Sequence, residues 1–442
     1  MKILFVSLGC DKNLVDSERM LGMLQRRGYD FTDDEAEADI VVVNTCCFIN
    51  DAKEESINTL LQMGELKKEG RIKALIAAGC LAQRYREEIQ KEIPEVDAIL
   101  GTTAIDRVVS AVDEVLAGQK QNHYNDINAK PTAGEKRVVT TGGHYAYLKI
   151  AEGCDKHCTY CIIPRVRGNY RSIPMEELLA EAGELAGMGV KELILVAQET
   201  TLYGVDLYGE KSLSKLLHEL AQIGGIYWIR LLYCYPEEIT DELIETIATE
   251  PKVCHYLDIP VQHASDPVLK RMGRRTNEEE LRTMIDRIRE RIPDICLRTT
   301  LISGFPGETK EDHEELYRFV NEMEFDRLGV FTYSQEEDTP AAAMADQVEE
   351  PVKESRRDEL MELQQAIAFE KAESMIGRVL TVMVEGKVAD EETYVTRTYR
   401  DAPGVDGYLF VNTTANLMTG DFVRVQVTDS NEYDLIGELY HE

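Results

Sequence analysis

The chain has 442 residues, and its 49 Lys and Arg against 81 Asp and Glu leave a formal net charge of −32 at pH 7. Nucleic-acid affinity depends on Lys and Arg that neutralise phosphates, so direct nucleic-acid binding is not expected here, whereas a basic partner protein suits the charge. The sequence has no run of about 18 apolar residues that would predict a membrane-spanning helix. It opens too polar for a signal peptide, and its ten cysteines therefore indicate a reducing cytoplasm and metal binding rather than disulfides.

The first 117 residues repeat a unit of strand and helix, and the length of the whole chain predicts two or three domains. Apolar runs that predict strands lie at residues 2–8, 39–43 and 73–78, and helical patterns follow at residues 17–27, 52–68 and 82–91. Strands that alternate with helices predict an α/β fold with a doubly wound parallel sheet.

Each of these three predicted strands is followed by a cysteine, namely Cys10, Cys46 and Cys80. Because ligands bind beyond the carboxyl ends of parallel strands, one topological rule brings the three thiols to the same edge of the sheet. Alternatively, the three cysteines are small hydrophobic residues that pack in the core. That alternative does not explain why all three occupy the same place in successive units. We therefore expect an auxiliary iron–sulfur cluster with three protein ligands at this edge, and a packing role for Cys47.

A stretch rich in Gly, Asn, Lys and Thr, residues 118–144, has little apolar periodicity and predicts a linker. Strand and helix patterns alternate again over residues 145–374, which predicts an incomplete (β/α) barrel that ends in a long helix. The expected strands are residues 145–151, 192–197, 228–233, 256–261, 297–302 and 328–333.

Three cysteines with the spacing C-x3-C-x2-C follow the first of these strands: Cys154, Cys158 and Cys161. Active sites of such barrels lie at the C-terminal ends of the strands. A [4Fe–4S] cluster is usually held by four cysteines, so three ligands leave one iron open to another molecule. A structural zinc site needs four ligands, commonly in two C-x2-C pairs; no second pair lies nearby, and His157 directly precedes Cys158 and would be cramped. The pattern therefore favours a cluster.

The last segment, residues 375–442, has five short alternating apolar runs separated by turn-rich pieces, which predicts a small antiparallel β-barrel. Its five Lys and Arg against twelve Asp and Glu leave a net charge of −7. A barrel that binds phosphates is expected to be basic. This charge therefore suits a basic protein partner better than RNA.

Together these features resemble the methylthiotransferases, a radical S-adenosylmethionine (SAM) family with two clusters and a C-terminal TRAM domain. The matching strings are GCDKNLVDSE at residues 9–18, LDIPVQHAS at 257–265, GFPGET at 304–309 and FTYS at 331–334. The first string is similar to the branch that modifies the β-carbon of an aspartate in ribosomal protein S-twelve. The resemblance implies domains at residues 1–117, 145–374 and 375–442, joined by the linker.

The resemblance also implies roles for single residues. In the family, Cys154, Cys158 and Cys161 hold the cluster that binds SAM, and Cys10, Cys46 and Cys80 hold the auxiliary [4Fe–4S] cluster. Further residues at the SAM site would be Tyr160 near the adenine and, at strand ends, Gln198, Glu199, Gln262 and Ser303. Glu199 occupies a position where the family more often has Asp. Both side chains carry a carboxylate, so the implied role is unchanged. No catalytic residue beyond the cluster ligands is implied.

The implied reaction needs an electron donor such as flavodoxin or ferredoxin, which reduces the cluster so that SAM is cleaved to a 5′-deoxyadenosyl radical. A tRNA methylthiotransferase acting on isopentenyladenosine is the alternative within the family. A non-catalytic iron–sulfur carrier or RNA-binding module is the alternative outside it. The six cysteines at the six ligand positions disfavour a non-catalytic protein, and the acidic C-terminal segment disfavours tRNA.

Overall fold

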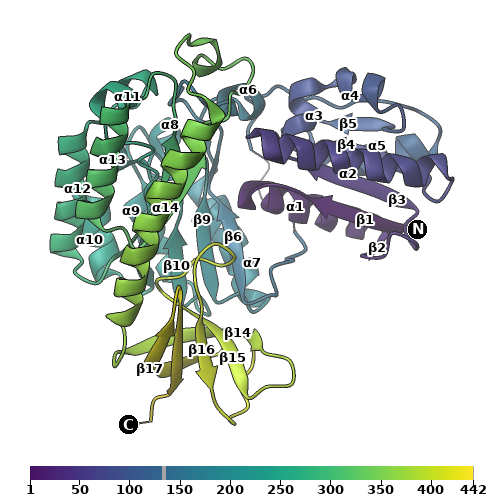
Figure 1. Cartoon of the computed structure of the whole chain (residues 1–442). Helices are drawn as coiled ribbons and strands as arrows, with labels where there is room; N and C mark the ends of the chain where they lie inside the picture. Colours follow the sequence, from purple (N-terminus) through teal and green to yellow (C-terminus); the bar gives the residue numbers. More distant parts are fainter. Residues whose placement is uncertain (132–135, 442) are drawn as a thin grey trace.

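The computed structural model describes residues 1–131 and 136–441, and its first layer is a parallel sheet at the N-terminus (Figure 1). The five strands lie in the order β2-β1-β3-β4-β5. They are β1 (Lys2–Ser7), β2 (Asp30–Thr32), β3 (Ile40–Thr45), β4 (Ala74–Ala78) and β5 (Ala98–Leu100). The helices are α1 (Asp11–Arg27), α2 (Asn50–Lys68), α3 (Gly79–Tyr85), α4 (Glu87–Glu92) and α5 (Val108–Leu116). Every residue of β3 and β4 is buried, as parallel strands covered on both faces require.

The central sheet is also entirely parallel, in the order β13-β12-β11-β10-β9-β6. Its strands are β6 (Tyr145–Lys149), β9 (Glu192–Val196), β10 (Trp228–Leu231), β11 (Val253–Asp258), β12 (Cys296–Ser303) and β13 (Arg327–Thr332). No hydrogen-bonded pairing of β6 with β13 occurs in the described residues, so the barrel is incomplete, which confirms the predicted class.

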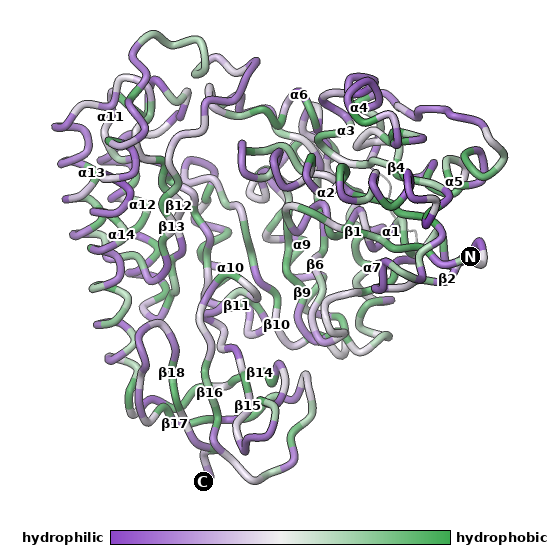
Figure 2. Tube along the Cα trace, turned by 45° about the vertical axis from the view of Figure 1, so that its right-hand side comes forward, coloured by the Kyte–Doolittle hydropathy of each residue, from purple (hydrophilic) through white to green (hydrophobic). Residues whose placement is uncertain are grey.

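The helices of the barrel form its outer wall (Figure 1). They include α7 (Met175–Gly187), α9 (Leu213–Ala221), α10 (Asp241–Thr249), α12 (Glu278–Arg291), α13 (Lys310–Met323) and the long α14 (Glu350–Glu373). Figure 2 shows hydrophilic residues recurring along the outer turns of α12, α13 and α14. Among the described residues, no helix is both long and apolar enough to cross a membrane.

The C-terminal segment forms a closed barrel in the order β14-β15-β16-β18-β17. The strands are β14 (Val379–Lys387), β15 (Thr393–Thr398), β16 (Leu409–Asn412), β17 (Phe422–Asn431) and β18 (Asp434–Leu439). The predicted barrel is confirmed, with one difference: β16 and β18 pair in parallel, while the other neighbours are antiparallel. The reason is geometric, because a closed ring with an odd number of strands cannot alternate in direction all the way round.

The stretch at residues 118–144 contains no helix or multi-residue strand in its described part, and residues 132–135 lie outside that part. Its second half runs along α1, where the amide of Val138 donates to the carbonyl of Glu18 at 3.1 Å. The amide of Thr140 donates to the Glu18 carboxylate at 2.7 Å. The connection between the two sheets is therefore fixed to the first helix.

Buried ion pairs join the central sheet to the C-terminal barrel. Glu192, at the start of β9, accepts from Arg230 Nε at 2.7 Å and from Arg397 Nη2 at 2.7 Å. The side chains of all three residues are fully buried. Burial alone would raise the pKa of the Glu192 carboxyl, but the two guanidinium groups hold it below its ordinary value. The carboxylate therefore stays charged in the interface.

The substitution Glu192→Gln is expected to lower the free energy of unfolding by about 3 kcal/mol, because it leaves two buried cations without their shared anion. Urea denaturation followed by circular dichroism measures the loss. The matched control is Glu245→Gln, which breaks an exposed pair with Arg291 held at 2.6 Å. That change is expected to stay within about 1 kcal/mol. Equal losses in the two variants would contradict a special role for the buried ion pairs.

Candidate iron–sulfur and SAM site

The three N-terminal cysteines lie at one edge of the first sheet. Cys10 follows β1 and immediately precedes α1, Cys46 directly follows β3, and Cys80 lies in the first turn of α3 after β4. A Cβ atom added to Gly9 would lie 2.8 Å from Cys46 Sγ, so the absence of a side chain lets the Cys10 loop approach the Cys46 loop. A Cβ on Gly79 would lie 2.5 Å from the Thr45 carbonyl oxygen, and the same argument holds for the Cys80 loop.

Burial shifts the pKa values of two of these thiols. Burial raises the pKa of Cys46, and Cys10 raises it further. Burial also raises the pKa of Cys80, against the opposing effect of Arg167. Three thiolates so close together would repel one another without positive charge between them. An iron–sulfur cluster supplies that charge, so the donor set fits an iron–sulfur cluster.

Asn13 ties the cysteine loops together and was missed as a site residue, although it lies within the string at residues 9–18. Its Nδ2 donates to the carbonyl of Leu8 at 3.0 Å and to the carbonyl of Thr45 at 3.0 Å. Both carbonyls lie just ahead of a cysteine, in the Cys10 loop and the Cys46 loop. The Thr45 carbonyl is 32 positions away in the sequence, so no local pattern signals this bridging role.

The second cysteine set lies in a loop beyond β6 and β7 (Ala151–Glu152), at the C-terminal end of the barrel. The amide of Cys154 donates to the carbonyl of Gly168 at 3.1 Å, and the amide of Cys161 donates to the carbonyl of Cys158 at 3.0 Å. Gly153 has φ +79°, and a Cβ there would lie 2.1 Å from a backbone oxygen of Asn169. Only glycine fits this turn into the loop.

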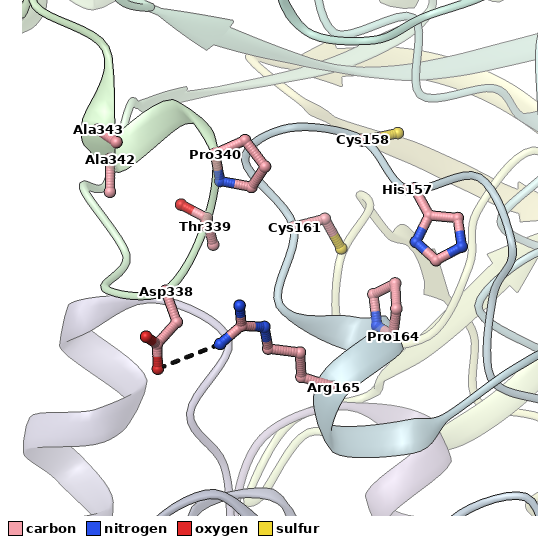
Figure 3. Close-up of a pocket in the computed structure, with 10 residues that line it drawn as sticks. All are labelled: His157, Cys158, Cys161, Pro164, Arg165, Asp338, Thr339, Pro340, Ala342 and Ala343. Atoms are coloured by element: carbon pink, nitrogen blue, oxygen red, sulfur yellow. Dashed lines mark ion pairs between the residues drawn. The ribbon is translucent and has the colours of Figure 1, made fainter.

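A cavity of about 600 Å³ opens beside Cys158 and Cys161 (Figure 3). An ion pair between Arg165 and Asp338, 3.4 Å apart, crosses its rim. Its other lining residues are His157, Pro164, Thr339, Pro340, Ala342 and Ala343. The cavity reaches two of the three predicted ligands of the SAM-binding cluster.

Two thiols of this loop, those of Cys154 and Cys161, also have raised pKa values. Burial raises the pKa of Cys154 to about 12. Burial also raises the pKa of Cys161, and the neighbouring Cys158 adds to that effect. In the described part of the chain, no three His, Cys, Asp or Glu side chains are placed to hold a single metal ion. Each thiolate of a [4Fe–4S] cluster binds its own iron, so these ligands stand further apart than those of one ion.

Gln198 and Glu199 lie beside the cysteine loop, as their place after β9 predicts. Gln198 accepts from the amide of Gly153 at 2.9 Å and donates to Glu152 at 2.9 Å, so it fixes the start of the loop. Glu199 is completely buried, and its Oε1 accepts from the amide of Thr201 at 2.9 Å. Its Oε2 has no hydrogen-bond partner. That oxygen is able to accept from the amino group of a bound ligand.

The other three predicted SAM contacts have partners of different kinds. Tyr160 packs edge to face against Phe305, with ring centroids 6.3 Å apart. Gln262 has φ +71° and forms an isolated bridge with Leu301. The hydroxyl of Ser303 donates to the carbonyl of Lys353 on α14 at 2.6 Å. In this structure the Ser303 hydroxyl therefore fastens a helix, and the predicted SAM contacts of all three residues stay predictions.

Two residues near the second cysteine set escaped the sequence analysis. The hydroxyl of Tyr235 lies 3.3 Å from Cys158 Sγ, and the guanidinium of Arg274 lies 4.2 Å from the centroid of the Tyr235 ring. Tyr235 is 77 positions from Cys158 in the sequence, and neither Tyr235 nor Arg274 belongs to a recognisable motif. Cys47 is buried, in agreement with the packing role expected of it, and Cys234, Cys254 and Cys296 are buried as well.

Comparison with known proteins agrees with the three parts of the fold. Residues 2–101 match the model of an uncharacterized protein family, UPF0004. Residues 148–320 match the radical SAM superfamily, and residues 376–439 match the TRAM domain. A solved structure of TsrM, a radical SAM methyltransferase from Kitasatospora setae, is similar with a TM-score of 0.55 and 13% identity. That similarity covers 77% of this chain and 73% of TsrM. The chain is thus a radical SAM protein in fold.

Relatives that align over nearly the whole chain identify the family more specifically. A ribosomal protein uS12 methylthiotransferase RimO from Lachnoclostridium phytofermentans is 64% identical over 437 residues, which cover 99% of each chain. The protein of the same name from Acetivibrio thermocellus is 51% identical and covers all of this chain and 99% of its own. The chain belongs to the methylthiotransferase family of radical SAM enzymes. Membership in that superfamily implies SAM and a [4Fe–4S] cluster as cofactors.

The Glu199 carboxyl is expected to make stability depend on pH in the cofactor-free protein. Burial raises its pKa from the ordinary 4.5 to about 7. A raised pKa means that the folded state favours the protonated form, so this stabilisation is complete below pH 4.5 and is lost as the pH rises through 7. The loss amounts to about 3 kcal/mol, since each pKa unit corresponds to about 1.4 kcal/mol.

The measurement compares urea unfolding of the parent protein and Glu199→Gln from pH 4.5 to pH 8, an interval that brackets the shifted pKa. The difference between the two proteins is expected to change with pH, because Gln does not titrate. Replacing the exposed Glu177 by Gln on α7 is the matched control and is expected to follow the parent. Parallel pH profiles for the parent and Glu199→Gln would contradict the raised pKa.

Proposed function

We propose that this chain is a radical SAM methylthiotransferase that adds a methylthio group to the β-carbon of an aspartate in ribosomal protein uS12. The observation that carries the proposal is the 64% identity, over 99% of both chains, to a relative named as a ribosomal protein uS12 methylthiotransferase. The two sets of three cysteines, each at the carboxyl edge of a parallel sheet, support it. The proposed ligands are Cys154, Cys158 and Cys161 for the SAM-binding cluster and Cys10, Cys46 and Cys80 for a second one.

The clusters and SAM would supply the radical chemistry and the transferred sulfur when they are bound. The residues of the chain bind, orient and exclude water. Gln198 holds the second cysteine loop against β7. Oε2 of Glu199 lies 4.0 Å from Lys156 Nζ but accepts no hydrogen bond, and it would accept one from the SAM ammonium group. Asn13 keeps the Cys10 and Cys46 loops at a fixed separation. The proposed site thus depends on rigid loops that strand ends anchor.

The outer surface of the C-terminal barrel supports a basic protein as substrate. Two of its five basic residues face the central barrel, where Arg397 pairs with Glu192 at 2.7 Å and Arg400 pairs with Asp326 at 2.6 Å. The exposed loop between β14 and β15 carries Asp390, Glu391 and Glu392 side by side. The surface of the C-terminal barrel that a partner can reach is therefore strongly acidic. An electron donor such as flavodoxin or ferredoxin completes the proposed set of partners, and the cytoplasm is the proposed location.

Replacing one cysteine set at a time tests the proposal. The anaerobically reconstituted parent is expected to bind about eight irons, as two [4Fe–4S] clusters. The change of Cys154, Cys158 and Cys161 to Ala is expected to remove about half of that iron and to abolish SAM cleavage. The change of Cys10, Cys46 and Cys80 to Ala is expected to remove the other half, to leave 5′-deoxyadenosine formation and to abolish methylthio transfer.

Iron analysis, chromatography of 5′-deoxyadenosine and mass spectrometry of uS12 give the three readouts. The control is Cys234→Ala, a buried cysteine outside both sets, which is expected to keep all of the iron. Full iron content after either triple replacement would overturn that ligand assignment. A methylthio group found on tRNA and missing from uS12 would overturn the substrate.

A charge reversal tests how the C-terminal barrel meets its substrate. Replacement of Asp390, Glu391 and Glu392 by Lys is expected to weaken uS12 binding at least fivefold at low salt. The effect is expected to shrink as salt rises, because ions screen exposed charges beyond a Debye length of about 8 Å at physiological ionic strength. SAM cleavage without substrate is expected to stay at the parent level, since this loop lies outside the central barrel.

Binding is measured by surface plasmon resonance at several salt concentrations. The control reverses three other exposed acids, Glu279, Glu290 and Glu311 on α12 and α13, which changes the net charge by the same amount. These helices lie on the outer wall of the central barrel, away from the β14–β15 loop (Figure 1). Equal weakening in both variants would show a general charge effect and contradict docking on the C-terminal barrel.

A further inference from the structure

One buried arginine connects the two cysteine sets. Arg167 is the last residue of α6 (Ile163–Arg167), a helix that begins two residues after Cys161. Its side chain leaves the central barrel and reaches the edge of the first sheet, where only 2% of it is exposed. The loop of the second set and the cysteines of the first set are therefore joined through a single side chain.

The guanidinium uses each of its three nitrogens. Nε donates to Cys80 Sγ at 3.4 Å. Nη1 donates to Asp16 at 2.7 Å and to Glu152 at 3.1 Å, and Nη2 donates to the side-chain oxygen of Asn13. The fixed fork of an arginine makes these contacts together, since its planar group holds the donors in set directions.

The charges around Arg167 already balance without the sulfur. Lys149 pairs with Asp16 and, at 2.8 Å, with Glu152, so two cations face two carboxylates. All four side chains are at most 7% exposed. Because the carboxylates have these partners, the Nε–H group remains for the sulfur of Cys80. The contact with sulfur is therefore an addition to a complete ion network.

The contact with Asn13 extends the reach of Arg167 to the other two cysteine loops. While Asn13 accepts from Arg167 through its oxygen, its nitrogen donates to the carbonyls of Leu8 and Thr45. Arg167 thus contacts the Cys80 ligand directly and the Cys10 and Cys46 loops through one amide. No other arginine in the described residues donates to the sulfur of one of these three cysteines.

We propose that Arg167 is a positioning residue of the N-terminal cysteine site, which donates a hydrogen bond to the Cys80 sulfur and raises the reduction potential of the cluster held there. The inference rests on the proposed function, which assigns that cluster to Cys10, Cys46 and Cys80. Hydrogen bonds to ligand sulfurs tune cluster potentials. A donor with positive charge stabilises the reduced state, which carries one more negative charge.

The test uses Arg167→Lys in full-length protein whose Cys154, Cys158 and Cys161 are all Ala, so that a single cluster gives the signal. Lysine keeps the positive charge between Asp16 and Glu152 but has no fork that also reaches the sulfur. Redox titration with dithionite, followed by electron paramagnetic resonance, is expected to show a ratio of reduced to oxidised cluster about tenfold lower at a fixed potential. Tenfold equals a shift of 59 mV for one electron.

A second variant and a control keep the test decisive. Arg167→Gln retains a neutral donor and is expected to shift the potential in the same direction. Arg165→Lys, on the same helix, is the control and is expected to keep the parent potential, since Arg165 points to Asp338 (Figure 3).

Two results overturn the inference. If both Arg167 variants have the same reduction potential as the parent, the hydrogen bond to the Cys80 sulfur has no effect on the cluster. Loss of the cluster in both variants, while Arg165→Lys keeps it, would show that Arg167 only holds the loops. The absence of iron from the protein with Arg167 intact is a different result, because it would overturn the N-terminal cluster of the proposed function itself.

Discussion

The arrangement of the two sheets depends on charges that are buried between them. Helix α1 carries the charged residues Asp16, Glu18 and Arg19, and each is at most 2% exposed. Arg19 pairs with Glu181 on α7 at 2.9 Å, and Arg137 of the connecting segment lies 3.2 Å from the same Glu181. Loss of one partner from such a pair leaves an uncompensated charge in a place that water does not reach. The first helix can therefore dock on the barrel in one register only.

This docking decides where the chemistry takes place. The carboxyl edge of the first sheet and the C-terminal end of the barrel face each other, and the loops with the two cysteine sets meet between them. Hydrophobic contact alone tolerates sliding, because it is proportional to area and has no direction. Hydrogen-bonded ion pairs have direction, and here they fix loops that carry the proposed cluster ligands. The same interactions thus serve both the stability of the fold and the geometry of the site.

Much of the fold was predictable, because the periodicity of apolar residues in strands and helices is a local property of the sequence. The six central strands and the five C-terminal strands lie where the apolar runs placed them. The sequence analysis missed β2 and β5, because each has only three residues and relies on its neighbours in the sheet. The first helix was expected from residue 17, whereas α1 starts at Asp11, because tertiary contacts bury polar side chains of its first turns such as Asn13 and Asp16.

The site was predictable only in part. Strand-end position brought Cys10, Cys46 and Cys80 to one edge, because topology determines where such residues lie. The contact between Arg167 and Cys80 spans 87 positions, and no local pattern encodes it. Likewise, no local pattern encodes the hydrogen bond from the Ser303 hydroxyl to the carbonyl of Lys353 on α14. Side-chain orientation depends on the tertiary contacts that the periodicity of a sequence does not contain.

The buried charged residues of α1 also limit how freely the parts of this protein can be exchanged. A chimera that joined residues 1–117 to a foreign radical SAM barrel would bury Asp16 and Glu18 opposite a surface without Lys149 or Arg137. The two halves must therefore be inherited together, or be transplanted with the residues that face α1. The two sheets are regular enough to be recognised separately. They cannot be exchanged independently, because the α1 interface joins them.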